Sequence, residues 1–343
     1  MDPSATRMFA EAAEAADVVS RQSDDRGLYE ALAEKLRALD APLAFTCARG
    51  SSDHAATYAK HLLETQLGLP VVSQSPSIVS IYGGRLERAK GALFLAISQS
   101  GRSPDLLMSA RAARDAGALV VALVNDAQSP LAELAEIVLP LRAGPEISVA
   151  ATKSYLATLA AVSRLTTVWA DDRALSQAVE TLPAALSEAW SLDWSAVGHF
   201  FVAAKGAFVL GRGPTLGIAQ EAALKFKETC AIHAEAFSIA EVAHGPMELI
   251  DEGFPVLVLA PGDAGDAGLD ALIGRFVERG ARVMVAGRSI PGCLEAPTVP
   301  GLHPAVAPIA MAQSFYRMVN AVAVARGRDP DQPAMLSKVT RTL

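Results

Sequence analysis

Cysteine, aromatic and charged residues are all scarce in this sequence. Its 343 residues include three cysteines, 6% aromatic residues and 20% charged residues, and the formal net charge is −7. Three cysteines far apart in the chain argue against a disulfide framework or a structural zinc site and are typical of a reducing cytoplasm. The sequence also has no basic run, no zinc-finger spacing and no ladder of aromatic and arginine residues. We therefore expect no nucleic-acid partner.

Apolar runs long enough to cross a membrane are absent as well. The longest, Leu119–Val124 and Pro255–Ala260, have the length of β-strands. The N-terminal stretch MDPSATRMFAEAAEAADVV is acidic and rich in alanine, without the basic region that begins a signal peptide. We expect a helical arm there, no membrane contact and a cytoplasmic location.

What the sequence does have is a large apolar fraction arranged in short runs. Hydrophobic residues make up 51% of the chain, which suits strands that are covered on both faces of a parallel sheet. In the first half, candidate strands alternate with candidate helices, a pattern typical of βαβ units in a three-layer sandwich. The expected strands are 43–47, 70–73, 92–97 and 119–124, and the expected helices are 1–40, 53–67, 103–116 and 150–170.

The second half repeats this plan. Three landmarks recur at one offset: Arg49-Gly50 aligns with Arg212-Gly213, strand 93–97 with 256–260, and Gly117-Ala118 with Gly280-Ala281 (212 − 49 = 256 − 93 = 280 − 117 = 163). Gapless agreement over this distance indicates an internal duplication. The period is too long for a solenoid, so we predict two tandem α/β domains joined through helices between about Asp171 and Val197.

Only the first copy has hydroxyl-rich turns after its strands. Backbone amides and side-chain hydroxyls at the carboxyl end of a strand, followed by a helix N-terminus, form a favourable phosphate site. No GxxxxGK[ST] or GxGxxG pattern occurs, so nucleoside triphosphates and dinucleotides are disfavoured. The alternative is that these residues only cap helices and form turns, as Ser103 before Pro104 would. The residues concerned are Ser51, Ser52, Ser98, Gln99, Ser100 and Ser103.

The second copy instead has a dense group of titratable residues between Glu221 and Pro246. Glu221, Lys225 and Glu228 fall at i, i+4 and i+7 of an expected helix, so they share one stripe. The stripe is compatible with a solvated face. However, two histidines and two more carboxylates follow within a short apolar span, which favours a site that moves protons. These residues are His233, Glu235, Glu241 and His244.

Several stretches together resemble one known family. They are ARGSSDHA (48–55), ISQSGRSPD (97–105), PEISVAATKSY (145–155), GRGPTLGIAQEAALKFKETCAIHAEAFSIAEVAHGP (211–246) and DQPAMLSKV (331–339). The chain is similar to tandem sugar isomerase (SIS) domain proteins, among them the isomerase half of glucosamine-6-phosphate synthase and stand-alone glucosamine-6-phosphate deaminases. The resemblance implies two tandem three-layer αβα domains, each with a parallel, flavodoxin-like sheet.

The resemblance also implies roles for individual residues. The two serine turns named above would bind the sugar phosphate, and the backbone at Val149 and Ala151 would line the sugar site. Glu228 would move a proton between C1 and C2, with Glu221 and Lys225 as its companions. His244, which the family often takes from a neighbouring subunit, would help to open the sugar ring. Lys338 would reach the open-chain carbonyl.

The resemblance further implies the reaction and the assembly. We expect a homodimer, with His244 donated across the interface, that deaminates glucosamine 6-phosphate to fructose 6-phosphate and ammonia without a metal or organic cofactor. The expected parts are an arm (1–22), a phosphate-binding domain (23–185), a catalytic domain (186–330) and a tail that enters the site (331–343).

Departures from the synthase argue against synthesis. No glutaminase segment precedes MDPSA, so no channelled ammonia is expected; Ala243 replaces a lysine, and Gly101-Arg102-Ser103 replaces SGET. The alternatives are a phosphosugar isomerase or ketosamine-phosphate deglycase, an aminotransferase-type isomerase without its glutaminase domain, and a non-catalytic sugar-phosphate sensor.

Overall fold

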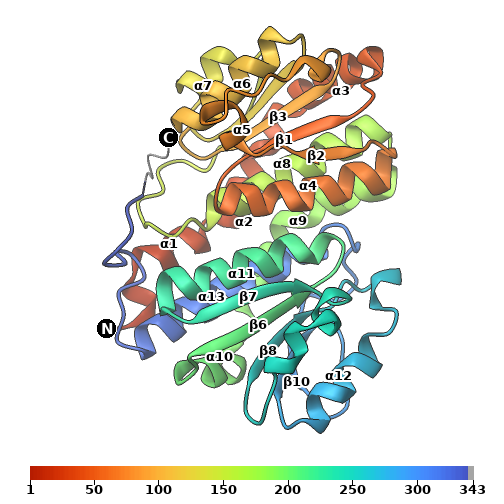
Figure 1. Ribbon diagram of the computed structural model, residues 1–343. Coiled ribbons are helices and arrows are strands. Elements are labelled where there is room, and N and C mark those ends of the chain that lie inside the picture. The colour runs from red at the N-terminus through yellow and green to blue at the C-terminus, as the bar shows by residue number, and fades with distance from the viewer. Residues whose placement is uncertain (339–343) are drawn as a thin grey trace. The chain divides into compact units, whose positions relative to one another are not determined.

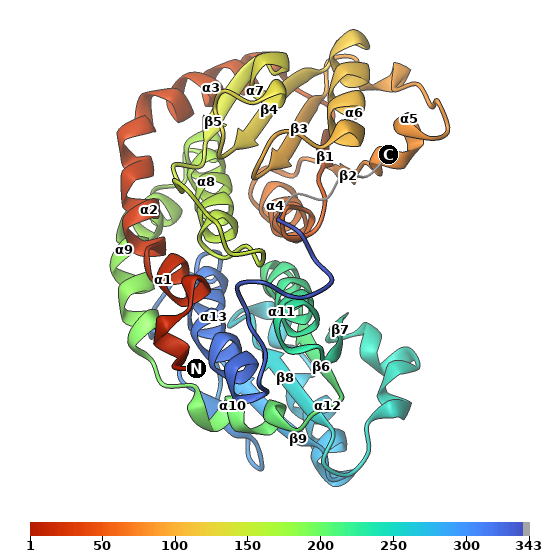
Figure 2. The same cartoon turned by 90° about the vertical axis from the view of Figure 1, so that its left-hand side faces the viewer.

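The computed structural model describes residues 1–338 and divides into two compact units (Figures 1 and 2). Unit 1 contains Met1–Ala16, Ile147–Thr152 and Thr181–Lys338, and unit 2 contains Asp17–Glu146 and Lys153–Glu180. Each unit is therefore assembled from separate stretches of chain. The arm, domain and tail boundaries expected from the sequence stay a prediction, and positions 339–343 of the expected tail lie outside the described residues.

Unit 2 is built on a five-stranded parallel sheet in the order β2-β1-β3-β4-β5. Its strands are β1 (Ala44–Cys47), β2 (Val71–Ser73), β3 (Leu93–Ser98), β4 (Leu119–Val124) and β5 (Ile137–Pro140). All residues of β3 and β4 are buried, because helices cover both faces of the sheet. The helices are α3 (Arg26–Leu39), α4 (Ser51–Leu67), α5 (Pro76–Ser80), α6 (Pro104–Asp115), α7 (Pro130–Leu134) and α8 (Lys153–Ala170), with the 3₁₀ turns η2 (Gln22–Asp25) and η3 (Glu87–Ala89).

Unit 1 has a second parallel sheet in the order β10-β9-β8-β6-β7. Its strands are β6 (Gly206–Gly211), β7 (His233–Ser238), β8 (Pro255–Leu259), β9 (Arg282–Ala286) and β10 (Leu294–Ala296). Its helices are α1 (Arg7–Ala13), α10 (Ser195–Val202), α11 (Pro214–Cys230), α12 (Leu269–Glu278) and α13 (Ala307–Ala325), with the 3₁₀ turns η1 (Pro3–Ala5), η4 (Glu241–His244), η5 (Pro246–Leu249) and η6 (Ala264–Asp266). Two further helices, α2 (Ala15–Arg21) and α9 (Arg173–Ser191), each contribute residues to both units.

The two units have one topology, as the repeat at an offset of 163 predicts. Matching β1 with β6, β2 with β7 and β3 to β5 with β8 to β10 makes the two strand orders identical. Helices α4 and α11 begin and end at the same offset (214 − 51 = 163 and 230 − 67 = 163). The predicted pair of three-layer parallel folds is confirmed. Strands β5, β7 and β10 were not predicted from the sequence, although the same offset from 70–73 points to β7.

The turn before α4 and the turn before α11 depend on glycine. Gly50 (φ 56°, ψ −133°) and Gly213 (φ 60°, ψ −133°) occupy a backbone region that side chains with a Cβ avoid. The sharp turn between strand and helix places the N-terminus of each helix at the carboxyl end of the sheet. In the first copy this turn presents Ser51 and Ser52, and in the second it directs α11 along the face of the sheet.

The C-terminal end of α11 is held by Arg326, which follows α13. Its Nε donates to the Cys230 carbonyl (2.8 Å), and its Nη1 donates to the carbonyls of Phe201, Val202 and Ala204 (3.1, 2.7 and 2.9 Å). One guanidinium therefore satisfies backbone carbonyls at the ends of both α10 and α11, which a helix leaves without partners in its last turn.

We predict that Arg326→Ala lowers the free energy of unfolding by about 2 kcal/mol or more, because partly buried carbonyls lose a charged donor. The exposed neighbour Arg328 gives the matched control: Arg328→Ala should change stability by less than about 0.5 kcal/mol. Chemical denaturation of both variants measures the difference. Equal effects would show that Arg326 contributes no more than surface charge.

Candidate active site

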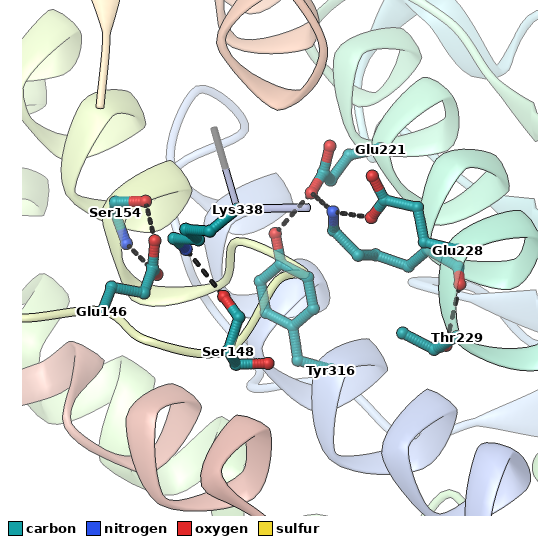
Figure 3. Close-up of polar contacts among 9 residues, drawn as sticks. Glu146, Ser148, Ser154, Glu221, Glu228, Thr229, Tyr316 and Lys338 are labelled. Atoms are coloured by element: carbon teal, nitrogen blue, oxygen red, sulfur yellow. Dashed lines mark hydrogen bonds and ion pairs between the residues drawn. The ribbon is translucent and has the colours of Figure 1, made fainter. Parts of the chain in front are cut away.

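Helix α11 carries a buried ion cluster formed by Glu221, Lys225 and Glu228. Figure 3 shows the two glutamates of this cluster. The Lys225 ammonium lies 3.3 Å from Glu221 Oε1 and donates a short hydrogen bond to Glu228 Oε2. The side chains of Lys225 and Glu221 are each 1% exposed, whereas that of Glu228 is 20% exposed. The stripe read from the sequence is therefore not a solvated face. It is a buried cluster with one carboxylate that solvent can reach.

A tyrosine from α13 completes the cluster. The Tyr316 hydroxyl donates to Glu221 Oε1 over 3.0 Å, and the Tyr316 residue is 1% exposed (Figure 3). Reasoning from the sequence missed this residue. A signal was present, since four polar side chains are buried in the mostly apolar helix α13: Gln313, Ser314, Tyr316 and Asn320.

The electrostatics of the cluster are set by opposing effects on Lys225. Burial by itself lowers the pKa of Lys225, but the charges of Glu221 and Glu228 and their hydrogen bonds outweigh burial and raise the pKa above its ordinary value. Lys225 therefore remains an ammonium ion. Of the two carboxylates beside it, Glu221 is buried and Glu228 is partly exposed.

The segment Ile147–Thr152 lies in unit 1 and is held by its backbone. The Glu11 carboxylate accepts hydrogen bonds from the Ile147 and Ser148 amides (2.5 and 3.2 Å). The Val149 amide donates to the Asp331 carbonyl (3.2 Å). Val149 and Ala151, which the sequence singled out, are partly buried in this segment. Sequence reasoning did not identify Glu11 as the residue that fixes its shape.

Lys338 reaches the same segment from the end of the described chain. Its ammonium donates to the Ser148 carbonyl over 2.7 Å (Figure 3). The preceding Asp331 carboxylate accepts from the amides of Arg7 and Met8 (2.8 and 2.7 Å). The tail is thus attached to unit 1 through both side chain and backbone, beside the residues expected to line a sugar site.

The serine turns lie in unit 2 at the carboxyl end of its sheet. Ser98 Oγ accepts from the Gly101 amide (3.0 Å), which folds the loop back on itself. Gly101 has φ +63°, and a Cβ there would lie 2.1 Å from Ser129 Oγ, so only glycine fits the turn.

Three of the other serines lie at the start of a helix, and Ser100 lies in a loop. Ser103 is the N-cap residue of α6, as predicted, but its hydroxyl makes no capping hydrogen bond to the helix. Ser51 and Ser52 form the first turn of α4 and are partly buried. Gln99 and Ser100 continue the loop after β3 and are partly buried. The turn after β1 and the loop after β3 meet at neighbouring strands, since β1 pairs with β3.

Two arginines near these turns are already paired with carboxylates. Arg49 donates two hydrogen bonds to Asp105 Oδ2 (3.0 and 2.8 Å), and Asp105 is completely buried in the first turn of α6. Arg102 donates to Asp126 (2.7 Å). The Arg49–Asp105 pair connects the turn after β1 to the helix after β3, so it fixes the spacing of the two serine turns.

The remaining titratable residues of the 221–246 stretch are not part of the cluster. His244 is exposed at the end of η4, and within residues 1–338 no hydrogen bond joins it to Glu221, Lys225 or Glu228. His233 and Glu235 lie on β7. Burial raises the pKa of the Cys230 thiol to about 11, which fits a small buried side chain rather than a nucleophile.

Across residues 1–338, no group of three or more histidine, cysteine, aspartate or glutamate side chains is arranged to hold a metal ion. Over the same residues, no helix combines the length and the hydrophobicity needed to span a membrane.

Comparison with known proteins agrees with this architecture. The SIS domain model matches residues 39–168 and 200–286, one stretch in each half of the chain. Glutamine–fructose-6-phosphate aminotransferase (isomerizing) of Zymomonas mobilis is 33% identical over 306 residues, which are 84% of this chain and 50% of that protein. The chain spans about half the length of the curated relatives it matches.

Two solved structures are similar over nearly their whole length. A candidate phosphosugar isomerase from Silicibacter pomeroyi is 44% identical with a TM-score of 0.90, covering 95% of this chain and all of that chain. The C-terminal domain of glucosamine-fructose-6-phosphate aminotransferase from Francisella tularensis is 25% identical with a TM-score of 0.84, covering 96% and 98% of the two chains.

We predict that Lys225→Met destabilises unit 1 by about 3–5 kcal/mol at neutral pH, because two carboxylates lose the charge between them. The raised pKa of Lys225 means that its stabilisation is complete below the ordinary value of 10.5 and is lost as the pH rises above it. The difference in the free energy of unfolding between wild type and Lys225→Met should therefore be constant up to about pH 10 and then decrease.

Lys60, which pairs with Glu64 in a half-exposed i,i+4 arrangement on the counterpart helix α4 and also donates to the Val71 carbonyl, provides the matched control. Lys60→Met should cost less than about 1 kcal/mol. Denaturant unfolding between pH 7 and 11 measures both variants. A Lys225→Met cost no larger than that of Lys60→Met would contradict the described cluster.

Proposed function

The chain belongs to the SIS domain family, and from that membership we propose that it is a phosphosugar isomerase that interconverts an aldose and a ketose, with glucosamine 6-phosphate as its substrate. The observation that carries the proposal is the buried cluster of Glu221, Lys225 and Glu228, in which only Glu228 is accessible. Aldose–ketose isomerisation needs one base that removes a proton at C2 and returns it at C1. Glu228 suits that role.

The proposed reaction begins with the open-chain aldehyde. Glu228 removes the C2 proton, and the electron pair moves toward the C1 carbonyl to give an enediol-type intermediate that carries the amino group at C2. Glu228 then returns the proton to C1, which leaves an imine at C2. Water hydrolyses this imine to fructose 6-phosphate and releases ammonia. The proton transfer and the hydrolysis of the imine in this proposed reaction require no metal and no organic cofactor.

The other residues are assigned to binding and to charge. The serine turns of unit 2 are proposed to bind the phosphate through backbone amides, hydroxyls and helix N-termini; their residues are Ser51, Ser52, Ser98, Gln99, Ser100 and Ser103. Ser103 lies at the N-cap of α6, but its hydroxyl makes no capping hydrogen bond to the helix, and this supports the assignment. The backbone at Val149 and Ala151 is proposed to line the sugar site.

Lys338 and His244 are assigned to the carbonyl and the ring. Lys338 ends beside the Ser148 carbonyl, from where an ammonium group would stabilise negative charge that develops on the substrate carbonyl oxygen. Histidine titrates near neutrality, which suits proton transfer during ring opening. We propose that His244, exposed at the end of η4, serves the site of a second subunit in a homodimer.

Deamination is preferred over amino-sugar synthesis for chemical reasons. Synthesis needs a supply of ammonia, whereas hydrolysis of the imine needs only water. Two positions also differ from the synthase pattern: Ala243 replaces a lysine before His244-Gly245-Pro246, and Arg102, where the synthase loop has another residue, is paired with Asp126. Because Arg102 is paired with Asp126, the loop after β3 makes an ion pair at this position.

The decisive experiment is ammonia release from glucosamine 6-phosphate by the purified protein. We expect ammonia and fructose 6-phosphate in equal amounts, and a loss of about 10²- to 10⁴-fold in kcat for Glu228→Gln, which keeps the shape of the side chain but not its basicity. Turnover of an unaminated aldose phosphate without ammonia release from any amino sugar would refute the deaminase and leave the isomerase.

The same assay separates the remaining alternatives. A ketosamine-phosphate deglycase would release a free amine from a fructosyl-amine phosphate and would not act on glucosamine 6-phosphate. A non-catalytic sensor would bind the sugar phosphate equally well with Glu228→Gln and would exchange no solvent deuterium into C2 of the ligand.

A second prediction concerns the shared site. Glu228→Gln and His244→Ala homodimers should each be almost inactive, whereas a mixture refolded together should recover up to about one quarter of wild-type activity, the share expected when one site in each mixed dimer receives both intact residues. Activity of refolded mixtures at several ratios is the measurement. No recovery in mixtures that contain verified mixed dimers would place His244 in the site of its own subunit.

A further inference from the structure

Tyr316 differs from the other buried polar residues of α13. Gln313 donates to the Ala12 carbonyl, Ser314 to the Ala189 carbonyl, and Asn320 bonds with Thr6 and the Pro3 carbonyl. These three attach α13 to neighbouring segments of unit 1. Tyr316 instead donates to a charged group, the Glu221 carboxylate. Its hydroxyl is therefore connected to the ion cluster rather than to the packing of the helix.

Glu221 and Glu228 compete for one ammonium group. Lys225 lies closer to Glu228 Oε2, to which it donates a hydrogen bond, than to Glu221 Oε1, which is 3.3 Å away. This preference needs an explanation, because Glu221 is the more deeply buried carboxylate and a buried carboxylate has the greater need for a donor. The Tyr316 hydroxyl supplies such a donor to Glu221 at 3.0 Å.

We propose that Tyr316 is a positioning residue for proton transfer: by donating to Glu221, its hydroxyl keeps the Lys225 ammonium directed toward Glu228. The inference rests on the proposed function, since it concerns how the proposed base is held. Without the hydroxyl, Glu221 draws the ammonium toward itself. Glu228 then loses part of its positive partner and takes up a proton more readily from water, so fewer molecules have the base in its ionised form.

Within the described residues of unit 1, the other titratable groups near α11 have the following places and partners. Strands β6 and β8 carry no titratable side chain, and β7 carries His233 and Glu235. On α13, Arg317 donates to the carbonyls of Trp190 and Leu192. Beyond α11, Arg326 donates to backbone carbonyls, and Lys338 donates to the Ser148 carbonyl.

The test is Tyr316→Phe, which removes the hydroxyl and keeps the ring. Tyr58→Phe is the matched control, because the Tyr58 hydroxyl is also completely buried and hydrogen-bonded, to Ser163 Oγ in unit 2 (2.7 Å). Loss of a buried hydroxyl should lower the unfolding midpoint of both variants to a similar degree. Only Tyr316→Phe should alter the pH dependence of the reaction.

For Tyr316→Phe, we expect the acid limb of the kcat/KM profile to move to higher pH by about 0.5–1 unit, the change that a nearby charge produces when it moves away from a titrating carboxylate. The KM measured at a pH well above the acid limb should change less than about twofold, because the hydroxyl does not touch the substrate. A profile that coincides with those of wild type and Tyr58→Phe would overturn the proposal.

A second readout separates this inference from the proposed function. In protein labelled with ¹³C at the glutamate side-chain carboxyl carbon, the Glu228 signal is assigned through Glu228→Gln and titrated without substrate. Its midpoint should rise in Tyr316→Phe and stay unchanged in Tyr58→Phe. If the wild-type protein turns over no phosphosugar, the proposed function fails, and this titration still decides whether Tyr316 positions the cluster.

Discussion

The site depends on one buried ammonium group. Lys225 is fully enclosed, and it is stable there as a cation because Glu221 and Glu228 lie one turn before it and almost one turn after it on the same helix. Removing a charge from water is costly, so each member of the cluster needs the other two. This mutual dependence fixes the rotamers of all three side chains, and it leaves Glu228 in a defined position with its carboxylate accessible. A proton-transferring group requires that combination of restraint and access.

The rest of unit 1 supports this helix. Arg326 holds the last turn of α11 through the Cys230 carbonyl, and Tyr316 contacts the cluster from α13. Glu11 and Asp331 hold the 147–152 segment, whose Ser148 carbonyl receives the Lys338 ammonium. Residues from the start, the middle and the end of the chain therefore meet within one unit. The catalytic assignment is a proposal, but the convergence of these segments gives a physical reason why unit 1 is not a contiguous stretch.

The duplication produced two similar folds with different side chains on the equivalent helices. Both copies have a glycine turn, a 17-residue helix and a parallel sheet in one strand order. In the first copy, the helix that follows the turn carries a half-exposed Lys60–Glu64 pair. In the second, the equivalent helix packs against α13, and its Lys–Glu pairs are buried. The same backbone thus supports a half-exposed ion pair in one environment and a buried ion cluster in the other.

The sequence by itself determined the architecture, because apolar runs of strand length, glycine turns and a constant offset of 163 residues are local or periodic signals. It also placed Glu221, Lys225 and Glu228 on one stripe, since helical periodicity requires it. It did not determine whether that stripe faced water, because burial depends on which helix packs against it. Only the tertiary structure decided that α13 packs against α11, that Tyr316 bonds to Glu221, and that Arg49 is held by Asp105. Tyr316 is 95 residues from Glu221 in the chain, and no pattern within either helix specifies that contact.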